Sequence, residues 1–284
     1  TAAEGTAQAA VSEVTPVSIS TNEISGWPAG PEITSETGVL MDADSGTLLY
    51  SKGGDEIRYP ASITKIMTLL LAVENCSLKE DVVFTETGTR DISWDSGNIG
   101  MQVGEVMSMR ACLYALVIRS ANEVAAQIAE HVGGTEQHFV DMMNEKLKEL
   151  GLSDTAHFTN CVGLYDENHY CTVYDIAMIL EAAIDHPQCR EVLSTKKYTT
   201  SSTPEHPEGI QISNWFLRRI EDKDTGGEVI CGKTGFVAQS GSCAVSYGMD
   251  ESGKEYICAT VNAHSGWRCI YDHVELYKRF AKTV

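Results

Sequence analysis

Short apolar stretches separated by turn residues occur near both ends of this 284-residue chain. Near the N-terminus two such stretches flank the polar turn 42–46, and near the C-terminus two more flank the turn 250–253, so each pair predicts a β-hairpin. A further strand precedes the second hairpin. The expected strands are 38–41, 47–50, 228–233, 242–247 and 256–261. We expect all of them to join in one antiparallel sheet.

The middle of the chain has the periodicity of helices instead. Gly133 and Gly134 interrupt one helix before Thr135 caps the next, and a C-terminal helix has an amphipathic stripe. The stripe comprises Ile270, Val274, Leu276, Tyr277 and Phe280. The expected helices are an apolar run at 66–73, most of 108–150, a helix at 173–184 closed by Pro187, and the amphipathic helix at 267–282.

These elements predict an α/β fold in which an antiparallel sheet is flanked by helices and joined to a mostly helical subdomain. We expect the sheet region to span about 35–65 and 195–284, and the helical region about 66–194. The loop 152–171 between two helices is irregular and carries Asn160, Gly163 and His169. Residues 1–34 lack a convincing period and are expected to form a flexible leader.

Composition narrows the classes of partner. The net charge is −19, with 21 Lys and Arg against 40 Asp and Glu, which argues against nucleic acid and anionic membranes as partners. No apolar run approaches the roughly 20 residues that span a bilayer, so a soluble chain is expected. The chain does not begin with Met, which is compatible with a removed signal peptide.

Nine cysteines occur without a Cys-x-x-Cys or His-x-x-x-His pattern, so we expect no metal site and no cofactor. Cys231 is expected to pack near Lys233 without acting as a nucleophile.

Three short motifs follow one another along the chain: Ser-x-x-Lys at 62–65, Ser-x-Asn at 120–122 and Lys-Thr-Gly at 233–235. A lysine three residues after a serine in a helix lies one turn away on the same face, so Lys65 can activate Ser62 as a nucleophile. Ser120 and Asn122 offer a hydroxyl for proton relay and an amide for substrate contact, and the third motif offers a cation and a hydroxyl suited to a carboxylate. Such a motif set is typical of serine acyl transfer.

Each motif alone is weak, because similar strings occur elsewhere. Ser-x-x-Lys recurs at 194–197, and Ser-x-Asn recurs at 20–22 and 96–98. The strings at 62–65 and 120–122 stand at expected helix boundaries, whereas 194–197 is expected in a strand entry or loop, 96–98 in a glycine-rich turn and 20–22 in the leader.

Across about residues 35–283 the chain resembles the serine D-alanyl-D-alanine carboxypeptidases, the low-molecular-mass penicillin-binding proteins. Beyond the motifs, the resemblance rests on residues 41–46, 59–62, 119–123 and 169–175. It implies a β-lactamase/DD-peptidase-like fold and an exported enzyme at the extracellular face of the bacterial cell envelope. That enzyme would remove the terminal D-Ala of peptidoglycan stem peptides through an acyl-serine intermediate and would be trapped covalently by β-lactam antibiotics.

The resemblance also implies a role for each motif residue. Ser62 would be the nucleophile and Lys65 its base, Ser120 would pass a proton to the leaving amine, Asn122 would hold the substrate amide, and Lys233 would support the electrostatics around Ser120.

In the substrate-binding part, Thr234 of the Lys-Thr-Gly motif, with Gly235, would bind the terminal carboxylate, and Arg268 would be a second anchor for it. The N–H groups of Ser62 and Phe236 would form the oxyanion hole. His169 matches a family histidine, for which a hydrogen bond that orders its loop is at least as good an interpretation as catalysis.

Other interpretations stay open from the sequence. A class A β-lactamase shares the motifs and needs a glutamate for deacylation, for which Glu167 is the candidate. A sensor domain would be acylated without turnover, and endopeptidase activity would use the same chemistry. Cys171 replaces a commoner serine and could pair with Cys161. The chain ends soon after its last expected helix, so membrane attachment is not visible.

Overall fold

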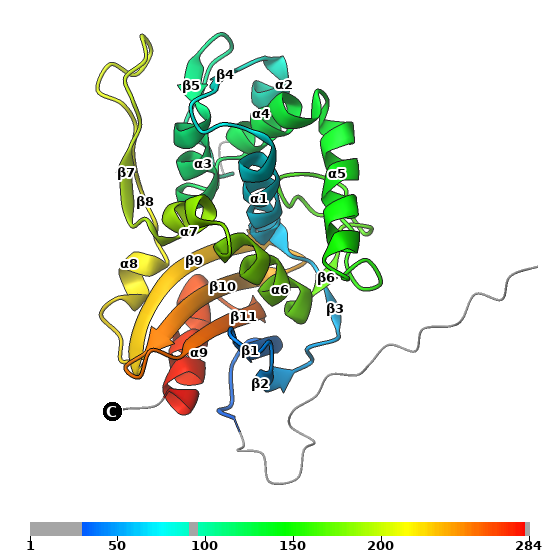
Figure 1. Ribbon diagram of the computed structural model, residues 1–284, viewed down its shortest axis with the longest axis vertical. Coiled ribbons are helices and arrows are strands. Elements are labelled where there is room, and N and C mark those ends of the chain that lie inside the picture. Colours follow the sequence, from blue (N-terminus) through cyan, green and yellow to red (C-terminus); the bar gives the residue numbers. More distant parts are fainter. Residues whose placement is uncertain (1–29, 91–95, 282–284) are drawn as a thin grey trace, which may run out of the picture.

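The computed structural model describes residues 30–90 and 96–281. A five-stranded antiparallel sheet lies at one end of the molecule, and most of the helices lie at the other (Figure 1). The strands follow the order β2-β1-β11-β10-β9 across the sheet. Their bounds are β1 Thr37–Asp42, β2 Leu48–Lys52, β9 Gly227–Val237, β10 Gly241–Asp250 and β11 Glu255–Ala263.

Strands from the two ends of the chain pair at the centre of this sheet. β1 pairs with β11 along its whole length, from Thr37 opposite Val261 to Asp42 opposite Tyr256. All four pairings in the sheet are antiparallel. The predicted fold class is therefore confirmed, with both hairpins in one sheet.

Alternate residues of each strand point to opposite faces of the sheet, so both faces have an apolar core. Val39 and Met41 of β1 belong to the large core that continues into the helical region, whereas Leu40 packs with the helices on the other face. The first face is covered by α6 (Val173–Ile184), and the second by α8 (Leu217–Ile220) and α9 (Gly266–Phe280).

The helical region surrounds α1 (Lys65–Asn75), which is buried along most of its length. α1 packs against helices on several sides, because its apolar residues cover more than one face. The other helices of this region are α2 Glu86–Thr89, α3 Met109–Ile118, α4 Asn122–Gly133, α5 Glu136–Glu149 and α7 Pro187–Ser194.

Within residues 30–90 and 96–281, three small two-stranded sheets lie outside the main one. The third of them, the hairpin β7–β8, extends beside α3 (Figure 1). This hairpin falls within residues 195–284, which were expected to form the sheet region, but it is separate from the main sheet. Their strands are β3 Ile57–Arg58 with β6 Cys171–Thr172, β4 Asp81–Val83 with β5 Val106–Ser108, and β7 Lys197–Thr199 with β8 Gln211–Ser213.

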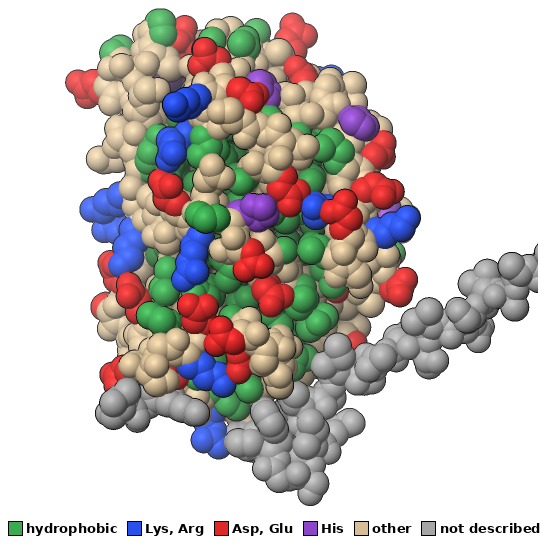
Figure 2. Space-filling model, in the orientation of Figure 1, with side chains coloured by type: hydrophobic (Ala, Val, Ile, Leu, Met, Phe, Trp, Pro, Cys, Tyr) green, Lys and Arg blue, Asp and Glu red, His purple; other side chains and the backbone are tan. Residues whose placement is uncertain are grey.

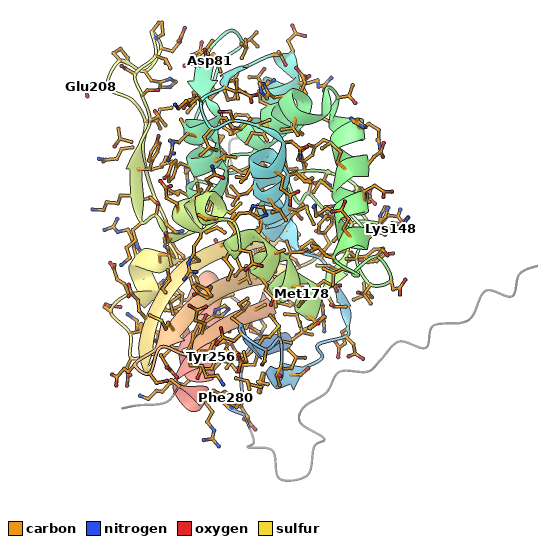
Figure 3. All side chains as sticks on the ribbon, in the orientation of Figure 1. Asp81, Lys148, Met178, Glu208, Tyr256 and Phe280 are labelled. Atoms are coloured by element: carbon orange, nitrogen blue, oxygen red, sulfur yellow. The ribbon has the colours of Figure 1, made fainter. Side chains whose placement is uncertain are left out.

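The predicted amphipathic helix near the C-terminus is α9. Ser265 caps it by accepting a hydrogen bond from the backbone N–H of Arg268 at 3.3 Å. The predicted stripe faces the sheet: its first four members are buried and Phe280 is partly buried. Near the end of the helix, the hydroxyl of Tyr256 on β11 donates to the Asp250 carboxylate at 2.8 Å and lies 3.2 Å from the Phe280 carbonyl oxygen (Figure 3).

The packed domain includes a few residues of the expected leader. Residues 1–29 lie outside the described residues. Ile33 is only 6% exposed, and the backbone N–H groups of Thr34 and Ser35 each donate to the Asp272 carboxylate at 2.8 Å. These contacts attach the chain to α9 just before the expected boundary at residue 35.

The surface and the thiols agree with an ordinary globular domain. Acidic and basic side chains are interspersed on the face seen in Figure 2. All nine cysteines are free thiols, including Cys161 and Cys171, and all but Cys76 are buried. Among the described helices, none combines the length and apolarity needed to cross a membrane.

Candidate active site

The Ser-x-x-Lys motif forms the junction between a 3₁₀ turn and α1. Ser62 lies in the turn Ala61–Thr64, and Lys65 is the first residue of the buried helix. Lys65 Nζ lies 2.9 Å from Ser62 Oγ and 2.7 Å from the carbonyl oxygen of Val162. The predicted contact between the lysine and the serine is therefore present, and a backbone carbonyl from a distant loop completes it.

Burial controls the charge of this lysine. The Lys65 side chain is fully buried, which lowers its pKa to about 7, because the ammonium form loses its hydration. Cys161 and Glu123 oppose the shift to a smaller extent. Lys65 is thus poised to change protonation state near neutral pH, as a general base requires.

The second motif lies against the third. Ser120 Oγ accepts a hydrogen bond from Lys233 Nζ at 3.0 Å, and the same nitrogen donates to the Thr234 carbonyl at 2.7 Å. Burial lowers the pKa of Lys233, and the positive charge of Lys65 lowers it further. Two positive charges repel each other in a buried site, so Lys65 and Lys233 are rarely both protonated. The neutral lysine can then accept a proton from the neighbouring serine.

Glycines allow three segments to meet at the nucleophile. A Cβ at Gly235 would lie 2.8 Å from Ser62 N, so β9 can pass this close to the turn only without a side chain there. A Cβ at Gly163 would lie 1.8 Å from the Ala61 carbonyl oxygen, and Gly163 has a φ of +94°. Ala61 itself has a φ of 49°, a left-handed conformation that is rare for residues other than glycine.

The Ser-x-Asn motif joins α3 to α4. Ser120 adopts a φ of 57°, and Asn122 begins α4. The carbonyl of Gly97 accepts the Asn122 N–H at 2.8 Å, and a Cβ at Gly97 would lie 2.4 Å from the Ser120 carbonyl oxygen. Residues 96–98 were interpreted from the sequence as an ordinary turn, but they pack directly against the motif. Gly97 was the one sequence feature that could have indicated this close packing.

Glu123, which the sequence analysis did not single out, holds this turn in place. Its Oε1 accepts the backbone N–H groups of Ile99 at 2.6 Å and Gly100 at 3.1 Å. The side chain is buried, which raises its pKa. The loop beside Ser120 is thereby tied to the first turn of α4.

His169 orders the loop that carries Val162. Its Nδ1 accepts the Thr159 N–H at 2.9 Å, so Nε2 carries the proton and donates to Thr64 Oγ1 at 2.8 Å. Burial lowers its pKa to about 4, and its ring stacks on Phe158. These contacts match the interpretation of His169 as a residue that orders the loop.

Asn160 shapes the same loop. Its Oδ1 accepts the N–H groups of Val162 at 3.2 Å, Gly163 at 2.7 Å and Leu164 at 3.1 Å. The carbonyl that contacts Lys65 is thus set by a side chain two residues earlier in the chain.

A groove of about 340 Å³ opens above Ser62. Ser62, Ser120 and Thr234 line it together with Gly235 and Phe236, whose ring is 67% exposed. Trp215, which the sequence analysis missed, forms one wall and lies edge-on to Trp267 at 5.6 Å between ring centroids. Trp215 is followed by the apolar Phe216 and Leu217, so its sequence context does not distinguish it from a core residue.

Arg268, predicted as a second anchor for the carboxylate, is exposed on the first turn of α9 and is not among the residues that line the groove. Gly266, at the start of the same helix, does line it. The structure places the lysines of the motifs beneath the groove, where both are buried.

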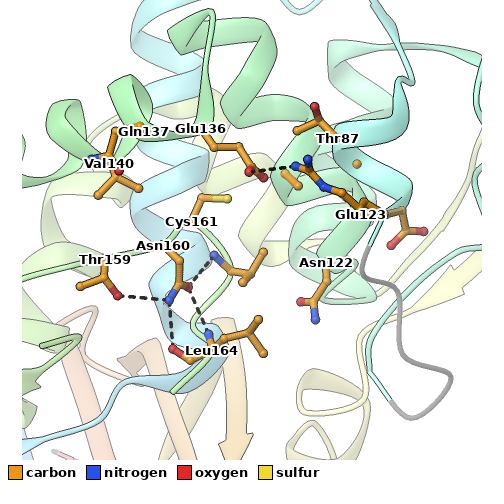
Figure 4. Close-up of a pocket in the computed structure, with 14 residues that line it drawn as sticks. Thr87, Asn122, Glu123, Glu136, Gln137, Val140, Thr159, Asn160, Cys161 and Leu164 are labelled. Atoms are coloured by element: carbon orange, nitrogen blue, oxygen red, sulfur yellow. Dashed lines mark hydrogen bonds and ion pairs between the residues drawn. The ribbon is translucent and has the colours of Figure 1, made fainter. Parts of the chain in front are cut away.

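A second cavity, of about 400 Å³, lies on the other side of Asn122 (Figure 4). Its wall includes the loop at Asn160 and Leu164 and an ion pair between Arg90 and Glu136 at 3.9 Å. Asn122 therefore lines this cavity and is not among the residues that line the groove above Ser62.

The similar strings elsewhere do not assemble such a site. Ser194 ends α7 and donates to the Glu191 carbonyl at 3.1 Å, whereas Lys197 begins β7. The string enters strand β7 as expected, but its serine still belongs to α7, which begins at Pro187. The string at 20–22 lies outside the described residues. Cys231 is buried, which raises the pKa of its thiol to about 12, so it packs without acting as a nucleophile.

Comparisons with known proteins identify the family of the chain. Residues 25–265 match the family described as D-alanyl-D-alanine carboxypeptidase. The chain is 34% identical over 162 residues to the D-alanyl-D-alanine carboxypeptidase DacF of Bacillus subtilis, covering 56% of this chain and 41% of DacF. It is 28% identical over 237 residues to a D-alanyl-D-alanine endopeptidase of Pseudomonas aeruginosa, covering 83% of this chain and 74% of that protein.

The fold agrees as well. The structure of penicillin-binding protein 5 from Haemophilus influenzae superposes with a TM-score of 0.79 at 26% identity, covering 89% of this chain and 72% of that chain. This chain spans less than half the length of DacF. The family match nevertheless covers most of the described domain and all three motifs, so the chain belongs to the D-alanyl-D-alanine carboxypeptidase family.

Proposed function

We propose that this domain is a serine D-alanyl-D-alanine carboxypeptidase that removes the terminal D-Ala of peptidoglycan stem peptides. The observation that carries the proposal is the contact of Lys65 Nζ with Ser62 Oγ beside the contact of Lys233 Nζ with Ser120 Oγ. Together the two contacts supply a nucleophile, its base and a route for a proton to the leaving group.

The acylation step follows from these contacts. Neutral Lys65 accepts the proton of the Ser62 hydroxyl, and Oγ attacks the carbonyl carbon of the penultimate D-Ala. The C–N bond to the terminal D-Ala then breaks. Ser120 donates its proton to the leaving nitrogen and is reprotonated from the paired lysines, which leaves an acyl-serine. Water attacks this ester in the second half of the reaction, with the proton transfers reversed.

The remaining residues bind the substrate in this proposal. Thr234, next to Gly235, binds the terminal carboxylate at the bottom of the groove, and Arg268 contributes longer-range attraction from its exposed place on α9. The N–H groups of Ser62 and Phe236 stabilise the oxyanion. Asn122, two residues after Ser120 at the start of α4, holds the substrate amide.

The substrate implies a place of action and a class of inhibitor. Peptidoglycan stems lie outside the cytoplasmic membrane, so we propose that the protein is exported. β-Lactams resemble the terminal dipeptide and acylate the same serine. The acidic composition and the mixed surface charge support neither nucleic acid nor anionic lipid as a partner.

Intact mass spectrometry tests the proposal directly. Penicillin is added to the wild type and to Ser62→Ala, and D-Ala release from a peptide ending in D-Ala-D-Ala is measured in parallel. We expect a lasting adduct and D-Ala release in the wild type, and neither in Ser62→Ala. Absence of both in the folded wild type would overturn the proposal.

Two alternatives give different results in the same experiment. A β-lactamase would consume penicillin with a short-lived adduct, but its candidate glutamate, Glu167, is exposed in a turn and lines neither the groove nor the second cavity. A sensor would form the adduct without releasing D-Ala.

Endopeptidase activity is a second candidate, favoured by the long alignment with the Pseudomonas aeruginosa endopeptidase. It uses the same acyl-serine, with a cross-linked amine as the leaving group. Digestion of cross-linked dimeric muropeptides, compared with monomeric pentapeptides, separates the two activities.

A further inference from the structure

Cys76, Glu80 and His131 form a cluster of metal-ligating side chains at the opposite end of the helical region from the catalytic groove. One ligand atom of each residue lies within 4.8 Å of the other two. Asp81, the residue after Glu80, marks this end of the molecule in Figure 3. We propose that the cluster binds a single Zn²⁺-like divalent ion.

The donor atoms suit this kind of ion. A thiolate, an imidazole and a carboxylate are the three ligand types that zinc accepts in proteins, and water would complete a tetrahedral shell. Cys76 differs from the other eight cysteines because it is the one that is partly exposed. Binding replaces the Cys76 S–H bond by an S–Zn bond and releases one proton to solvent.

The side chains are already oriented towards one another. Glu80 Oε2 lies 2.9 Å from His131 Nε2, while Glu80 Oε1 accepts the Ser77 N–H at 2.7 Å. The Glu80 carbonyl also accepts the Met109 N–H at 2.8 Å, which fixes the backbone of the loop against α3. A backbone-anchored carboxylate between a thiol and an imidazole needs little rearrangement to bind an ion.

Two helix C-termini meet at this cluster. Cys76 directly follows α1, and His131 lies in the last turn of α4. The partial negative charges at both ends favour a cation there. The helix ends therefore attract a cation in addition to the attraction by the three side chains.

The position connects the cluster to the catalytic site. α1 begins at Lys65 and α4 begins at Asn122, so both helices run from the active site to the cluster. A bound ion would join their far ends. The ligands are separated by up to 55 residues, which is why a search for closely spaced ligands along the sequence found no metal site.

Titration of metal-free protein with Zn²⁺ and with Co²⁺ tests this site. We expect one equivalent to bind, a tetrahedral Co²⁺ spectrum with a thiolate-to-metal charge-transfer band, and a higher melting temperature with Zn²⁺. Cys76→Ser and His131→Gln should each weaken binding at least 100-fold and remove the melting shift, and Cys76→Ser should abolish the charge-transfer band.

His138→Gln is the matched control, because His138 is an exposed histidine on the neighbouring α5. It should bind both ions like the wild type. Penicillin acylation without metal serves as the folding check and should be unchanged in all three variants. Binding by wild type that equals binding by Cys76→Ser, or a Co²⁺ spectrum without the thiolate band, would overturn the proposal whatever the outcome for the carboxypeptidase activity.

Discussion

Lys65 Nζ contacts the carbonyl oxygen of Val162 at 2.7 Å while it also contacts Ser62 Oγ at 2.9 Å. A neutral lysine has two N–H bonds and one lone pair. If one N–H points at Val162, the lone pair is free to accept the Ser62 proton. In the proposed mechanism the carbonyl therefore orients the base, and the loop that carries Val162 belongs to the catalytic arrangement.

The first prediction concerns pH. Lys65 has a pKa of about 7, so it is charged and inactive as a base below that value and neutral above it. The second-order rate constant for acylation by penicillin should rise about tenfold per pH unit from pH 5 to 7 and level off above, a difference of about 100-fold.

Lys65→Arg provides the matching variant, because a guanidinium stays charged at every accessible pH. Its acylation should fall at least 1,000-fold at all pH values. A wild-type profile that is flat between pH 5 and 8 would exclude Lys65 as the titrating base.

The second prediction concerns Gly163, which has a φ of +94° and leaves no room for a Cβ, because that atom would lie 1.8 Å from the Ala61 carbonyl oxygen. Gly163→Ala should displace the neighbouring Val162 carbonyl from Lys65, so acylation should fall more than tenfold and the melting temperature should drop. Gly253→Ala is the control, since Gly253 has a φ of +85° but open space around it.

The control variant carries the backbone strain alone, about 1–2 kcal/mol, and should acylate at the wild-type rate. Equal acylation rates in Gly163→Ala and Gly253→Ala would mean that the loop position does not matter for the base.

The sequence predicted the parts of the site that depend on local spacing. Ser62 and Lys65 are three residues apart, so one turn brings them together regardless of the rest of the fold. The partners supplied by the backbone could not be predicted in this way. Any residue type can offer a backbone carbonyl such as that of Val162, which lies 97 positions from Lys65. The Gly97 carbonyl that accepts the Asn122 N–H likewise leaves no signal in the sequence.

Two elements between the helical region and the sheet were not predicted. Pro187 closes the predicted helix at 173–184, but proline is also favoured in the first turn of a helix, and here it begins α7. The hairpin β7–β8 was not predicted because its strands are only three residues long, too short for a clear alternating pattern. That both hairpins join one antiparallel sheet was predicted correctly, whereas the pairing of β1 with β11 that joins them is seen only in the structure.

The third prediction separates the hydroxyl of Ser120 from its backbone strain. Both Ser120→Ala and Ser120→Gly remove the partner of Lys233, so D-Ala release should fall about 10²- to 10⁴-fold in each. The φ of 57° strains alanine and not glycine. Urea unfolding should therefore find Ser120→Gly more stable than Ser120→Ala by about 1 kcal/mol. Substantial activity in either variant would remove Ser120 from the proton route.

The last prediction concerns acid stability. Burial lowers the pKa of His169 to about 4, against an ordinary value of 6.5, so the unfolded chain binds a proton more readily than the folded one. The stability contribution is complete above pH 6.5 and is lost as the pH falls towards and through 4. Between pH 7 and pH 5 this one histidine should cost about 2 kcal/mol of unfolding free energy.

Urea unfolding at the two pH values measures the effect. His169→Gln removes the titrating group, so its stability should fall by about 2 kcal/mol less than that of the wild type between pH 7 and pH 5. His273 is also buried, with its pKa lowered to about 4, and accounts for a similar part of the acid sensitivity that remains. Identical pH dependence in the wild type and in His169→Gln would mean that His169 is protonated as easily in the folded protein as in the unfolded chain. That result would contradict the two hydrogen bonds of its ring, because they require a neutral imidazole.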